Sequence, residues 1–123
     1  MNNMESSSFL EVKVKDRSGK IAAYLQCSCV NGEVKIKSLF SEAKYRNRGL
    51  EESLMQRAID FANRKKAATI IAYPGAEPYC RSGQMPKSKE IKFYQEQGFH
   101  IDHYIMGSPC MVKSLGGDTG SEA

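Results

Sequence analysis

The strongest constraint on the fold is a change of hydrophobic period in the middle of the chain. Residues 33–40, EVKIKSLF, alternate apolar and polar side chains and so predict a half-buried strand. From Gly49 to about Lys66 the apolar side chains recur every three or four residues, which places them on one stripe of a helix. The apolar run TIIAY, residues 69–73, then predicts a strand buried on both faces. Because a strand, a helix and a buried strand make a crossover unit, we expect the two strands to be parallel neighbours.

The segment before this unit predicts an antiparallel meander. Residues 9–16 alternate apolar and polar side chains, and residues 21–30 form a second run with few charges. Asn31-Gly32 is a strong signal for a two-residue hairpin, because both residues tolerate positive φ. The first third of the domain is therefore expected to be three sequential strands.

The segment after the unit predicts a second helix and two last strands. Ser88 is the expected N-cap of a helix that ends at Gly98 in a left-handed cap. Phe99 is then expected to lie over Tyr94, the usual apolar contact of such a cap. Strands on either side of residues 107–109 complete the order β-β-β-α-β-α-β-β. The predicted fold class is α+β, with a mixed and mostly antiparallel sheet and flanking helices.

Length and composition indicate one domain. The chain has 123 residues, which suits a single core. We assign residues 9–115 to the domain, residues 1–8 to a flexible N-terminus and residues 116–123, GGDTGSEA, to a disordered tail.

The charge and cysteine content exclude several functions. A net charge of +4 is too small to indicate a nucleic-acid partner without clustering, although it is compatible with a small anionic ligand. No apolar run is long enough to span a membrane and the N-terminus lacks a secretory signal, so we expect a cytoplasmic protein with reduced thiols. Cys27 and Cys29 lack the second close pair that a metal site needs, so no metal is expected.

The stretch AKYRNRGLEES, residues 43–53, joins the predicted strand to the predicted helix. Free backbone N–H groups and the positive end of the helix meet there, which is a setting that binds phosphate oxygens. Gly49 leaves room beside the backbone, and Arg46 and Arg48 add positive charge. The alternative is that these residues only open a helix and that their charges are solvated. Neither a P-loop nor a dinucleotide-binding pattern is present.

A second stretch, IKFYQEQGF at residues 91–99, gives the first one a context. Together they resemble the GCN5-related N-acetyltransferases. The acetyl-coenzyme A loop of that family reads Arg or Gln, two residues, Gly, one residue, then Gly or Ala, and here the residues are Arg46 to Glu51, RNRGLE. The family's later pattern, Phe-Tyr, three residues, Gly-Phe, is present as residues 93–99, FYQEQGF. The resemblance covers about residues 20–113.

The resemblance implies an acyl-CoA N-acyltransferase-like fold in which the central parallel strands splay apart around acetyl-CoA. It implies that the pantetheine arm and the diphosphate contact backbone groups of Leu39, Phe40, Ser41, Arg46, Asn47, Arg48, Gly49, Leu50 and Glu51. Tyr94 matches the tyrosine that protonates the leaving thiolate, a step that a phenol with a pKa of about 10 can perform; its alternative role is packing beside Phe99. Glu42, Glu77 and a terminal carboxylate are candidate bases for the amine acceptor.

Three departures from the family pattern bear on activity. Glu51 stands where the family prefers Gly or Ala, and we expect its carboxylate to lean outward and to weaken cofactor binding without abolishing it. Lys87 stands where the family often has Asn. The usual N-terminal strand and two helices, which wall the acceptor site, have no counterpart before Phe9, so this site is open to a large substrate or is closed by the 74–87 loop or by a second subunit in a homodimer.

The leading hypothesis is therefore an acetyl-CoA-dependent N-acetyltransferase that acts on an amine of a small molecule or a protein. The alternative is a degenerate member of the same fold that binds coenzyme A weakly or not at all and acts through protein–protein interaction. Glu51, Lys87 and the missing helices favour the alternative.

Overall fold

A computed structural model describes residues 2–5, 8–42, 45, 49–74 and 87–115. The expected disordered tail, most of the 74–87 loop and Glu77 lie outside these residues. The elements follow one another in the order β1 (Asn2–Glu5), β2 (Phe9–Lys15), β3 (Ile21–Val30), β4 (Glu33–Ser41), α1 (Leu50–Arg64), β5 (Thr69–Ala72), α2 (Lys87–Glu96), β6 (His100–Ile105) and β7 (Ser108–Ser114).

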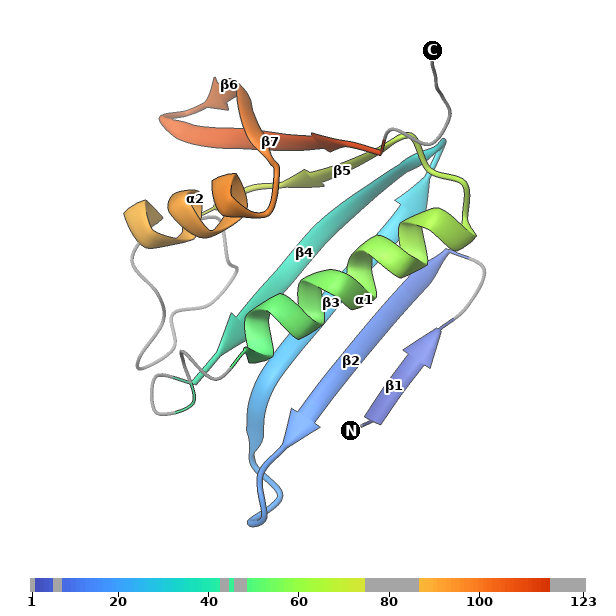
Figure 1. Cartoon of the computed structure of the whole chain (residues 1–123), viewed down its shortest axis with the longest axis vertical. Coiled ribbons are helices and arrows are strands. Elements are labelled where there is room, and N and C mark those ends of the chain that lie inside the picture. Colours follow the sequence, from blue (N-terminus) through green and yellow to red (C-terminus); the bar gives the residue numbers. More distant parts are fainter. Residues whose placement is uncertain (1, 6–7, 43–44, 46–48, 75–86, 116–123) are drawn as a thin grey trace.

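The strands form one seven-stranded sheet in the order β1-β2-β3-β4-β5-β7-β6. The β4–β5 pair is parallel and the other pairs are antiparallel. The predicted α+β class, the meander and the parallel central pair are thus confirmed. Both helices lie on the same face of the sheet, α1 across β2, β3 and β4, and α2 beside the end of β5 (Figure 1).

The turns and caps follow from local chemistry. Asn31 and Gly32 have φ values of 52° and 78°, as a type I′ hairpin requires, so the predicted turn is confirmed. Gly98 ends α2 with a φ of 93°. The N–H of Phe99 donates to the carbonyl of Tyr94 at 2.9 Å, so the predicted left-handed cap is also confirmed.

Three expectations about the elements are wrong. Residues 2–5 were assigned to a flexible terminus, yet they form β1 and pair with residues 10–13 of β2; backbone bonding to an open sheet edge needs no apolar pattern. Ser88 is not an N-cap, because α2 already begins at Lys87. Residues 69–73 are fully buried only on the helix-covered face: Ile70 and Ala72 are buried, whereas Thr69 and Ile71 are half-buried.

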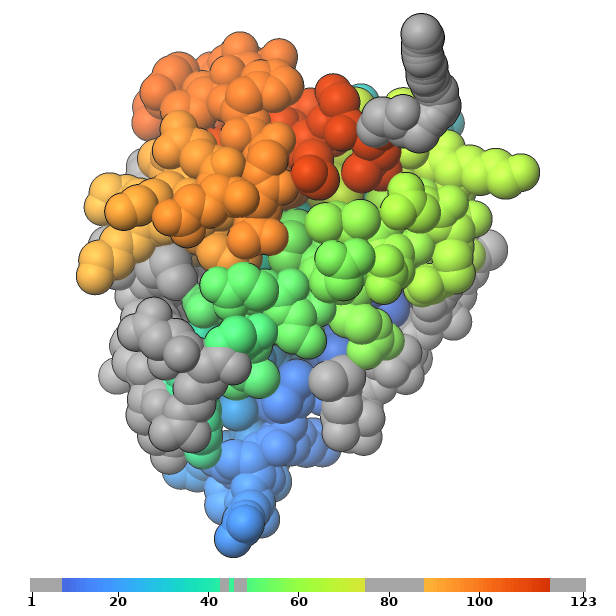
Figure 2. Space-filling model, viewed as in Figure 1, coloured from blue at the N-terminus to red at the C-terminus, as the bar shows by residue number. Residues whose placement is uncertain are grey.

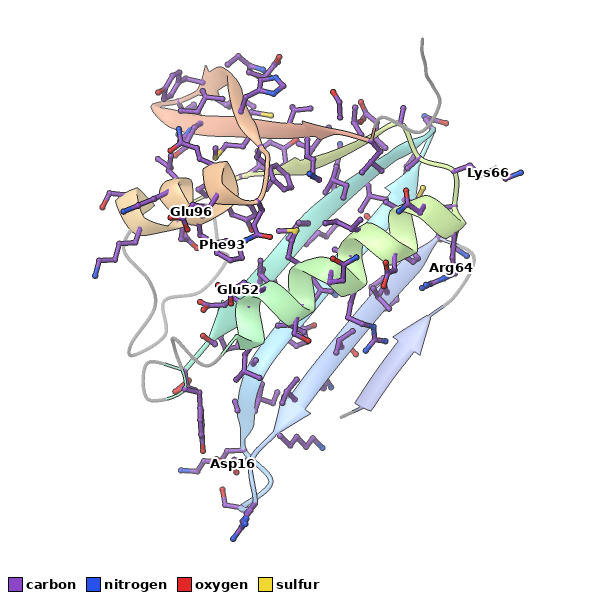
Figure 3. The ribbon with its side chains drawn as sticks, in the orientation of Figure 1. Asp16, Glu52, Arg64, Lys66, Phe93 and Glu96 are labelled. Atoms are coloured by element: carbon purple, nitrogen blue, oxygen red, sulfur yellow. The ribbon has the colours of Figure 1, made fainter. Side chains whose placement is uncertain are left out.

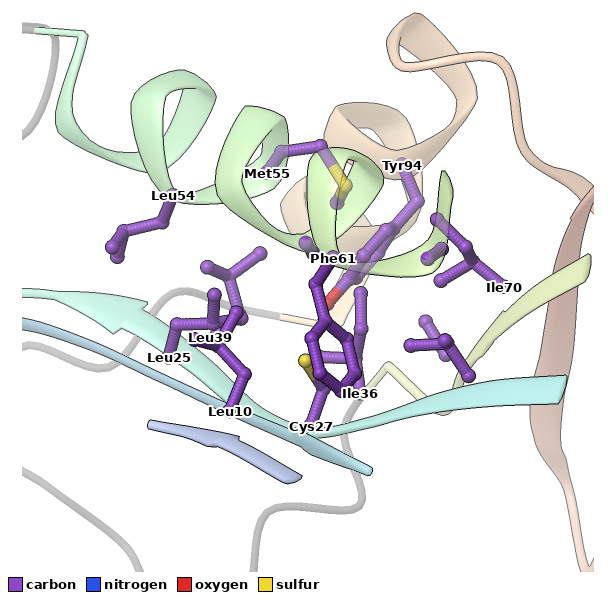
Figure 4. Packing of buried hydrophobic residues seen from close by; sticks show 14 of the residues in the cluster. Leu10, Leu25, Cys27, Ile36, Leu39, Leu54, Met55, Phe61, Ile70 and Tyr94 are labelled. Atoms are coloured by element: carbon purple, nitrogen blue, oxygen red, sulfur yellow. The ribbon is translucent and has the colours of Figure 1, made fainter. Parts of the chain in front are cut away.

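The core lies between α1, α2 and the sheet (Figure 4). The buried stripe of α1 includes Leu54, Met55, Ala58 and Phe61, and Tyr94 reaches the same cluster from α2. Burying one such large side chain stabilises the fold by about 1.5–3 kcal/mol. In the space-filling view the two helices form one continuous surface over the sheet (Figure 2).

Charged side chains at the ends of α1 complement its dipole. Glu51 and Glu52 lie in the first turn and Arg64 in the last turn, and Figure 3 shows Glu52 and Arg64 at opposite ends of the helix. Acidic groups at the start and basic groups at the end of a helix stabilise it by about 0.3–1 kcal/mol each.

Candidate functional site

The central parallel strands separate halfway along β4. Pairing with β5 runs from Glu33, opposite Thr69, to Ile36, opposite Ala72. There β5 ends, whereas β4 continues to Ser41 and diverges from it (Figure 1). We call residues 33–36 the paired half of β4 and residues 38–41 its open half.

A β-bulge at Lys37 marks the boundary between the two halves. In the β3–β4 ladder Gln26 lies opposite Ser38 and Cys27 lies opposite Ile36, so Lys37 has no partner residue in β3. An extra residue in one strand bends that strand and increases its local twist. The bulge falls where β4 leaves β5, and we infer that it is the physical cause of the separation.

The open half is buried although β5 does not cover its edge. Its four residues are 2% to 8% exposed. Leu39 and Ser41 lie opposite Leu25 and Ala23, whose side chains belong to the core under α1. Ser41 Oγ is buried and has no hydrogen-bond partner among the residues that the structure describes, which is an unfavourable state for a hydroxyl.

The other face of the open half carries Phe40. Its ring packs against the ring of Tyr24 with centroids 5.9 Å apart. The hydroxyl of Tyr24 in turn donates to Glu11 Oε2 at 2.5 Å. These contacts fix the end of β4 to β2 and β3, so the open half does not depend on β5 for its position.

The start of α1 lies near the end of the open half (Figure 1). Gly49 precedes the helix with a φ of 79° and has no side chain to cap it. A Cβ at Gly49 would meet nothing within 4 Å, so the predicted need for glycine here is conformational. The first intrahelical bond is donated by the N–H of Ser53 to the carbonyl of Gly49, at 2.9 Å, so the preceding amides have no acceptor within the helix. Arg46, Asn47 and Arg48 lie outside the described residues.

Glu51 is buried, contrary to the expectation that it leans outward. It is 9% exposed and lies on the buried stripe of α1 with Leu54, Met55 and Ala58. Spacings of three, four and seven residues place these side chains on one side of a helix. A carboxylate therefore lies beneath the first turn of α1, on the side that faces the sheet.

Tyr94 projects from α2 into the core and is 6% exposed. Its ring packs edge-on against Phe99, with centroids 5.1 Å apart, and against Phe93, at 5.5 Å. The expected contact between Tyr94 and Phe99 is thus confirmed. In Figure 4 the side chain points between α1 and the sheet, with its hydroxyl end toward the strands.

Glu42, the candidate base, follows β4 directly and is half-buried. Its N–H donates to the carbonyl of Ala22 at 2.8 Å, and its carbonyl accepts from the N–H of Tyr45 at 2.9 Å. The carboxylate at the end of β4 and the phenol of Tyr94 in α2 thus come from separate elements.

Asp16 connects this region to the β2–β3 turn. It accepts a hydrogen bond from the hydroxyl of Tyr45 at 3.3 Å. It also accepts from the hydroxyl and the N–H of Ser18 and from the N–H of Lys20. The hydrogen bond from the Ser18 hydroxyl is the main reason that the pKa of Asp16 is lowered. Figure 3 shows Asp16 at the far tip of the molecule, beyond the start of α1.

Sequence reasoning missed a tyrosine and a thiol on the opposite side of the sheet. Tyr73 directly follows β5 and lies close to the thiol of Cys110. Burial is the main cause that raises the pKa of both groups, so both stay protonated and Cys110 is a weak nucleophile. The signal that could have found them is Tyr73 itself, the first residue past the predicted buried strand.

Other site types find no support in the part of the chain that the structure describes. Within the described ranges no group of three or more His, Cys, Asp or Glu side chains could hold a metal ion. None of the described helices has the length and apolar character needed to cross a membrane.

Three solved structures that share this arrangement are acetyltransferases. The PaiA N-acetyltransferase of Thermoplasma acidophilum, in complex with coenzyme A, matches with a TM-score of 0.70, 14% identity, 88% of this chain and 62% of its own. The ribosomal-protein-S18-alanine N-acetyltransferase of Escherichia coli matches with a TM-score of 0.67, 19% identity, 93% of this chain and 75% of its own. An acetyltransferase of Bacillus cereus matches with a TM-score of 0.67 and 16% identity, over 87% of this chain and 73% of its own.

These matches define the fold. The chain has the acyl-CoA N-acyltransferase-like fold of the GCN5-related N-acetyltransferases, as expected. It spans less than two thirds of the length of the PaiA protein. No family model matches the sequence, and no curated protein does.

Proposed function

We propose that this protein is a cytoplasmic acetyl-CoA-dependent N-acetyltransferase that transfers an acetyl group to an amine by direct attack. The observation that carries the proposal is the bulge-driven separation of β4 from β5 beside the start of α1, where the N-cap residue is Gly49. The edge of the open half that faces away from β3 offers backbone donors and acceptors, and the start of α1 offers backbone donors and positive potential.

The cofactor would use these two sets of groups in sequence. The pantetheine arm carries amides, and an amide chain can hydrogen-bond to the strand edge at Leu39, Phe40 and Ser41, beyond the end of β5, as an added strand does. The diphosphate would take the amides of Gly49, Leu50 and Glu51. Arg46, Asn47 and Arg48 would complete this anion site.

Acetyl transfer needs a neutral amine and a proton for the leaving thiolate. We assign the proton to Tyr94, because a phenol with the ordinary pKa of about 10 can donate a proton at neutral pH. Its tight packing between Phe93 and Phe99 fixes the direction of the hydroxyl. We assign removal of the amine proton to Glu42, which lies at the end of the open half, either directly or through water.

The second candidate function is a degenerate module that acts through protein–protein interaction. One observation favours it: the buried carboxylate of Glu51 under the helix start opposes an anion at the same place. Lys87, in place of the family's Asn, favours it too.

Thermal unfolding with and without acetyl-CoA separates the two candidates. A ligand at one hundred times its dissociation constant stabilises the folded state by about 2.7 kcal/mol. We expect a clear rise in the unfolding midpoint at millimolar acetyl-CoA and no rise with acetate at the same concentration. An unchanged midpoint with acetyl-CoA would rule out the enzyme. A rise without release of free coenzyme A, across a panel of polyamines and lysine peptides, would favour the binding module.

A further inference from the structure

The carboxyl end of α2 receives its positive charge from another element. The last turn of α2, residues 93–96, contains no basic residue, although the final carbonyl groups of a helix carry partial negative charge and have no acceptor role left within the helix. The carbonyl of Gln97, directly after α2, accepts a hydrogen bond from Nζ of Lys113 at 2.9 Å. The charge that complements this end of the helix therefore comes from β7.

Lys113 projects from the face of the sheet that the helices cover. In the β5–β7 ladder it lies opposite Ile70, which is fully buried in the core beneath the helices. Residues directly opposite each other in a ladder point to the same face. The side chain of Lys113 is half-buried. Its ammonium thus approaches the end of α2 from a backbone position that the sheet fixes.

Gly98 leaves room for this ammonium. Its φ of 93° lies in the left-handed region that favours glycine at the end of a helix. A Cβ at Gly98 would also lie 2.7 Å from Nζ of Lys113, which is closer than real Cβ atoms come to another heavy atom. Backbone conformation and the space for Nζ therefore both require glycine here. The contact between Lys113 and the end of α2 is part of how the cap is built.

The same cap holds the backbone of Tyr94, the residue to which we assign the proton. The carbonyl of Tyr94 accepts from the N–H of Gln97 at 3.0 Å and from the N–H of Phe99 at 2.9 Å. Gln97 thus bonds to Tyr94 through its N–H and to Lys113 through its carbonyl. Two hydrogen bonds in series connect the ammonium of Lys113 to the backbone of Tyr94.

The position of the Tyr94 hydroxyl depends on where this turn lies relative to the sheet. The ring of Tyr94 packs against Phe93 and Phe99, which belong to α2 and its cap, so these contacts fix the ring relative to the helix. The hydrogen bond from Lys113 fixes the helix end relative to β7. The hydroxyl end of Tyr94 points toward the strands (Figure 4). A displacement of about 1 Å in a catalytic group can cost about a hundredfold in rate.

We propose that Lys113 is a positioning residue for acetyl transfer, because its ammonium holds the carboxyl end of α2 against the sheet and so sets where the Tyr94 hydroxyl lies. This inference rests on the proposed function, in which Tyr94 is the proton donor. Lys113 acts through the Gln97 carbonyl and is assigned no contact with acetyl-CoA or with the amine. A hydrogen bond from a charged donor suits this task, since it is stronger than one between neutral groups.

Steady-state kinetics of the full chain test the proposal. Lys113→Met keeps most of the side chain's length and removes the charge and the donor. We expect kcat to fall about tenfold, since the acid is displaced but not removed, and the KM for acetyl-CoA to change by less than about twofold. Lys92→Met is the matched control, because Lys92 is an exposed lysine of the same helix, and it should leave kcat unchanged.

A second pair of variants shows whether Lys113 acts through Tyr94. In Tyr94→Phe no hydroxyl is left to position, so adding Lys113→Met should lower the residual kcat by less than about twofold. A tenfold loss in both backgrounds would overturn the proposal. An unchanged kcat for Lys113→Met alone, or an equal loss for Lys92→Met, would overturn it too.

The NMR signals of the Tyr94 ring give a readout that needs no turnover. With isotope-labelled tyrosine, the ring signals that are missing in Tyr94→Phe belong to Tyr94. They should shift in Lys113→Met and stay in place in Lys92→Met. Unchanged signals in Lys113→Met would overturn the proposal even if the wild type transfers acetyl groups. Shifted signals in a protein that releases no coenzyme A would instead reject the proposed function and support the placement of Tyr94 by Lys113.

Discussion

The paired and open halves of β4 are built from the same strand but are buried in different ways. In the paired half, apolar Val34 and Ile36 face the core, while Glu33 and Lys35 face solvent. In the open half, the side chains on both faces of the strand are buried, and two of the four residues, Ser38 and Ser41, carry hydroxyl groups. The comparison shows that β4 leaves β5 without its side chains becoming exposed to solvent. A polar, enclosed strand edge is what an extended amide-bearing ligand requires.

The largest expected effect concerns the stability of the paired half. Ile36→Ala should lower the free energy of unfolding by about 2–5 kcal/mol, because Ile36 is almost fully buried in the core and the cavity left behind closes only in part. Urea unfolding measures it. Lys35→Ala, an exposed neighbour in the same half, is the control and should change the free energy by less than about 0.5 kcal/mol. A loss below 1 kcal/mol for Ile36→Ala would contradict this account of the core.

The next effect concerns the chemistry proposed beside the open half. Tyr94→Phe should lower kcat by about a hundredfold, as loss of a positioned proton donor does. The phenyl ring keeps the packing against Phe99, so the acetyl-CoA-induced rise in the unfolding midpoint should persist. Phe93→Leu tests packing alone. If Tyr94→Phe abolishes both turnover and the midpoint rise, Tyr94 is structural and not the acid.

A smaller effect is expected at the unpartnered hydroxyl of the open half. Ser41→Ala removes a buried group without a hydrogen bond, so the free protein should gain about 1 kcal/mol. If the hydroxyl donates to the cofactor, the same change should weaken acetyl-CoA binding about fivefold, as for one lost hydrogen bond. Calorimetry measures the affinity. Ser38→Ala, on the other face, is the comparison. An unchanged affinity in Ser41→Ala would show that the hydroxyl does not contact the cofactor.

Glu51 and Glu52 in the first turn of α1 carry the same charge, but only Glu51 is buried, so the two variants test the effect of burial on acetyl-CoA binding. Glu51→Ala should tighten acetyl-CoA binding about fivefold, since removing a carboxylate near the diphosphate relieves about 1 kcal/mol of repulsion. Glu52→Ala removes the same charge from an exposed position and should have a smaller effect, because water and salt screen it. If Glu51→Ala binds acetyl-CoA no more tightly than the wild type does, Glu51 supports the site and does not oppose the diphosphate.

The smallest effect lies beyond the open half, at Asp16. Its lowered pKa means that the ionised carboxylate is favoured by folding. The contribution of Asp16 to the free energy of unfolding is therefore present above the pKa of about 3.9 that an aspartate has in the unfolded chain. It is lost as the pH falls through the lower pKa of the folded state. The urea midpoints of wild type and Asp16→Asn should differ slightly at pH 7 and converge below about pH 4. A difference that grows in acid would contradict the sign of the shift.

Local chemistry made much of the fold predictable. The Asn31-Gly32 turn, the crossover through α1 and the cap at Gly98 each depend on residues close in sequence. By contrast, β1 forms because a polar segment adds to a sheet edge, and the edge is known only after the sheet is built.

Two features of the site were visible in the sequence but were not recognised. Ile36 and Leu39 stand three residues apart where alternation requires two, which is the signature of the bulge at Lys37. Glu51 stands three residues before Leu54, on the stripe that the helix buries. Positions 46–48 and the 75–86 loop lie outside the described residues, so the predictions made for them remain predictions.

The bulge at Lys37 has a further consequence for how this architecture tolerates change. Lys37 is the residue without a partner in β3, so deleting it alone would leave Ser38 opposite Gln26 and Ser41 opposite Ala23, on the faces that they occupy now. A shortened strand would also lose its bend and could continue alongside β5. We therefore expect the separation of the central strands to rest on one surplus residue, so deleting Lys37 should weaken acetyl-CoA binding more than substituting it does.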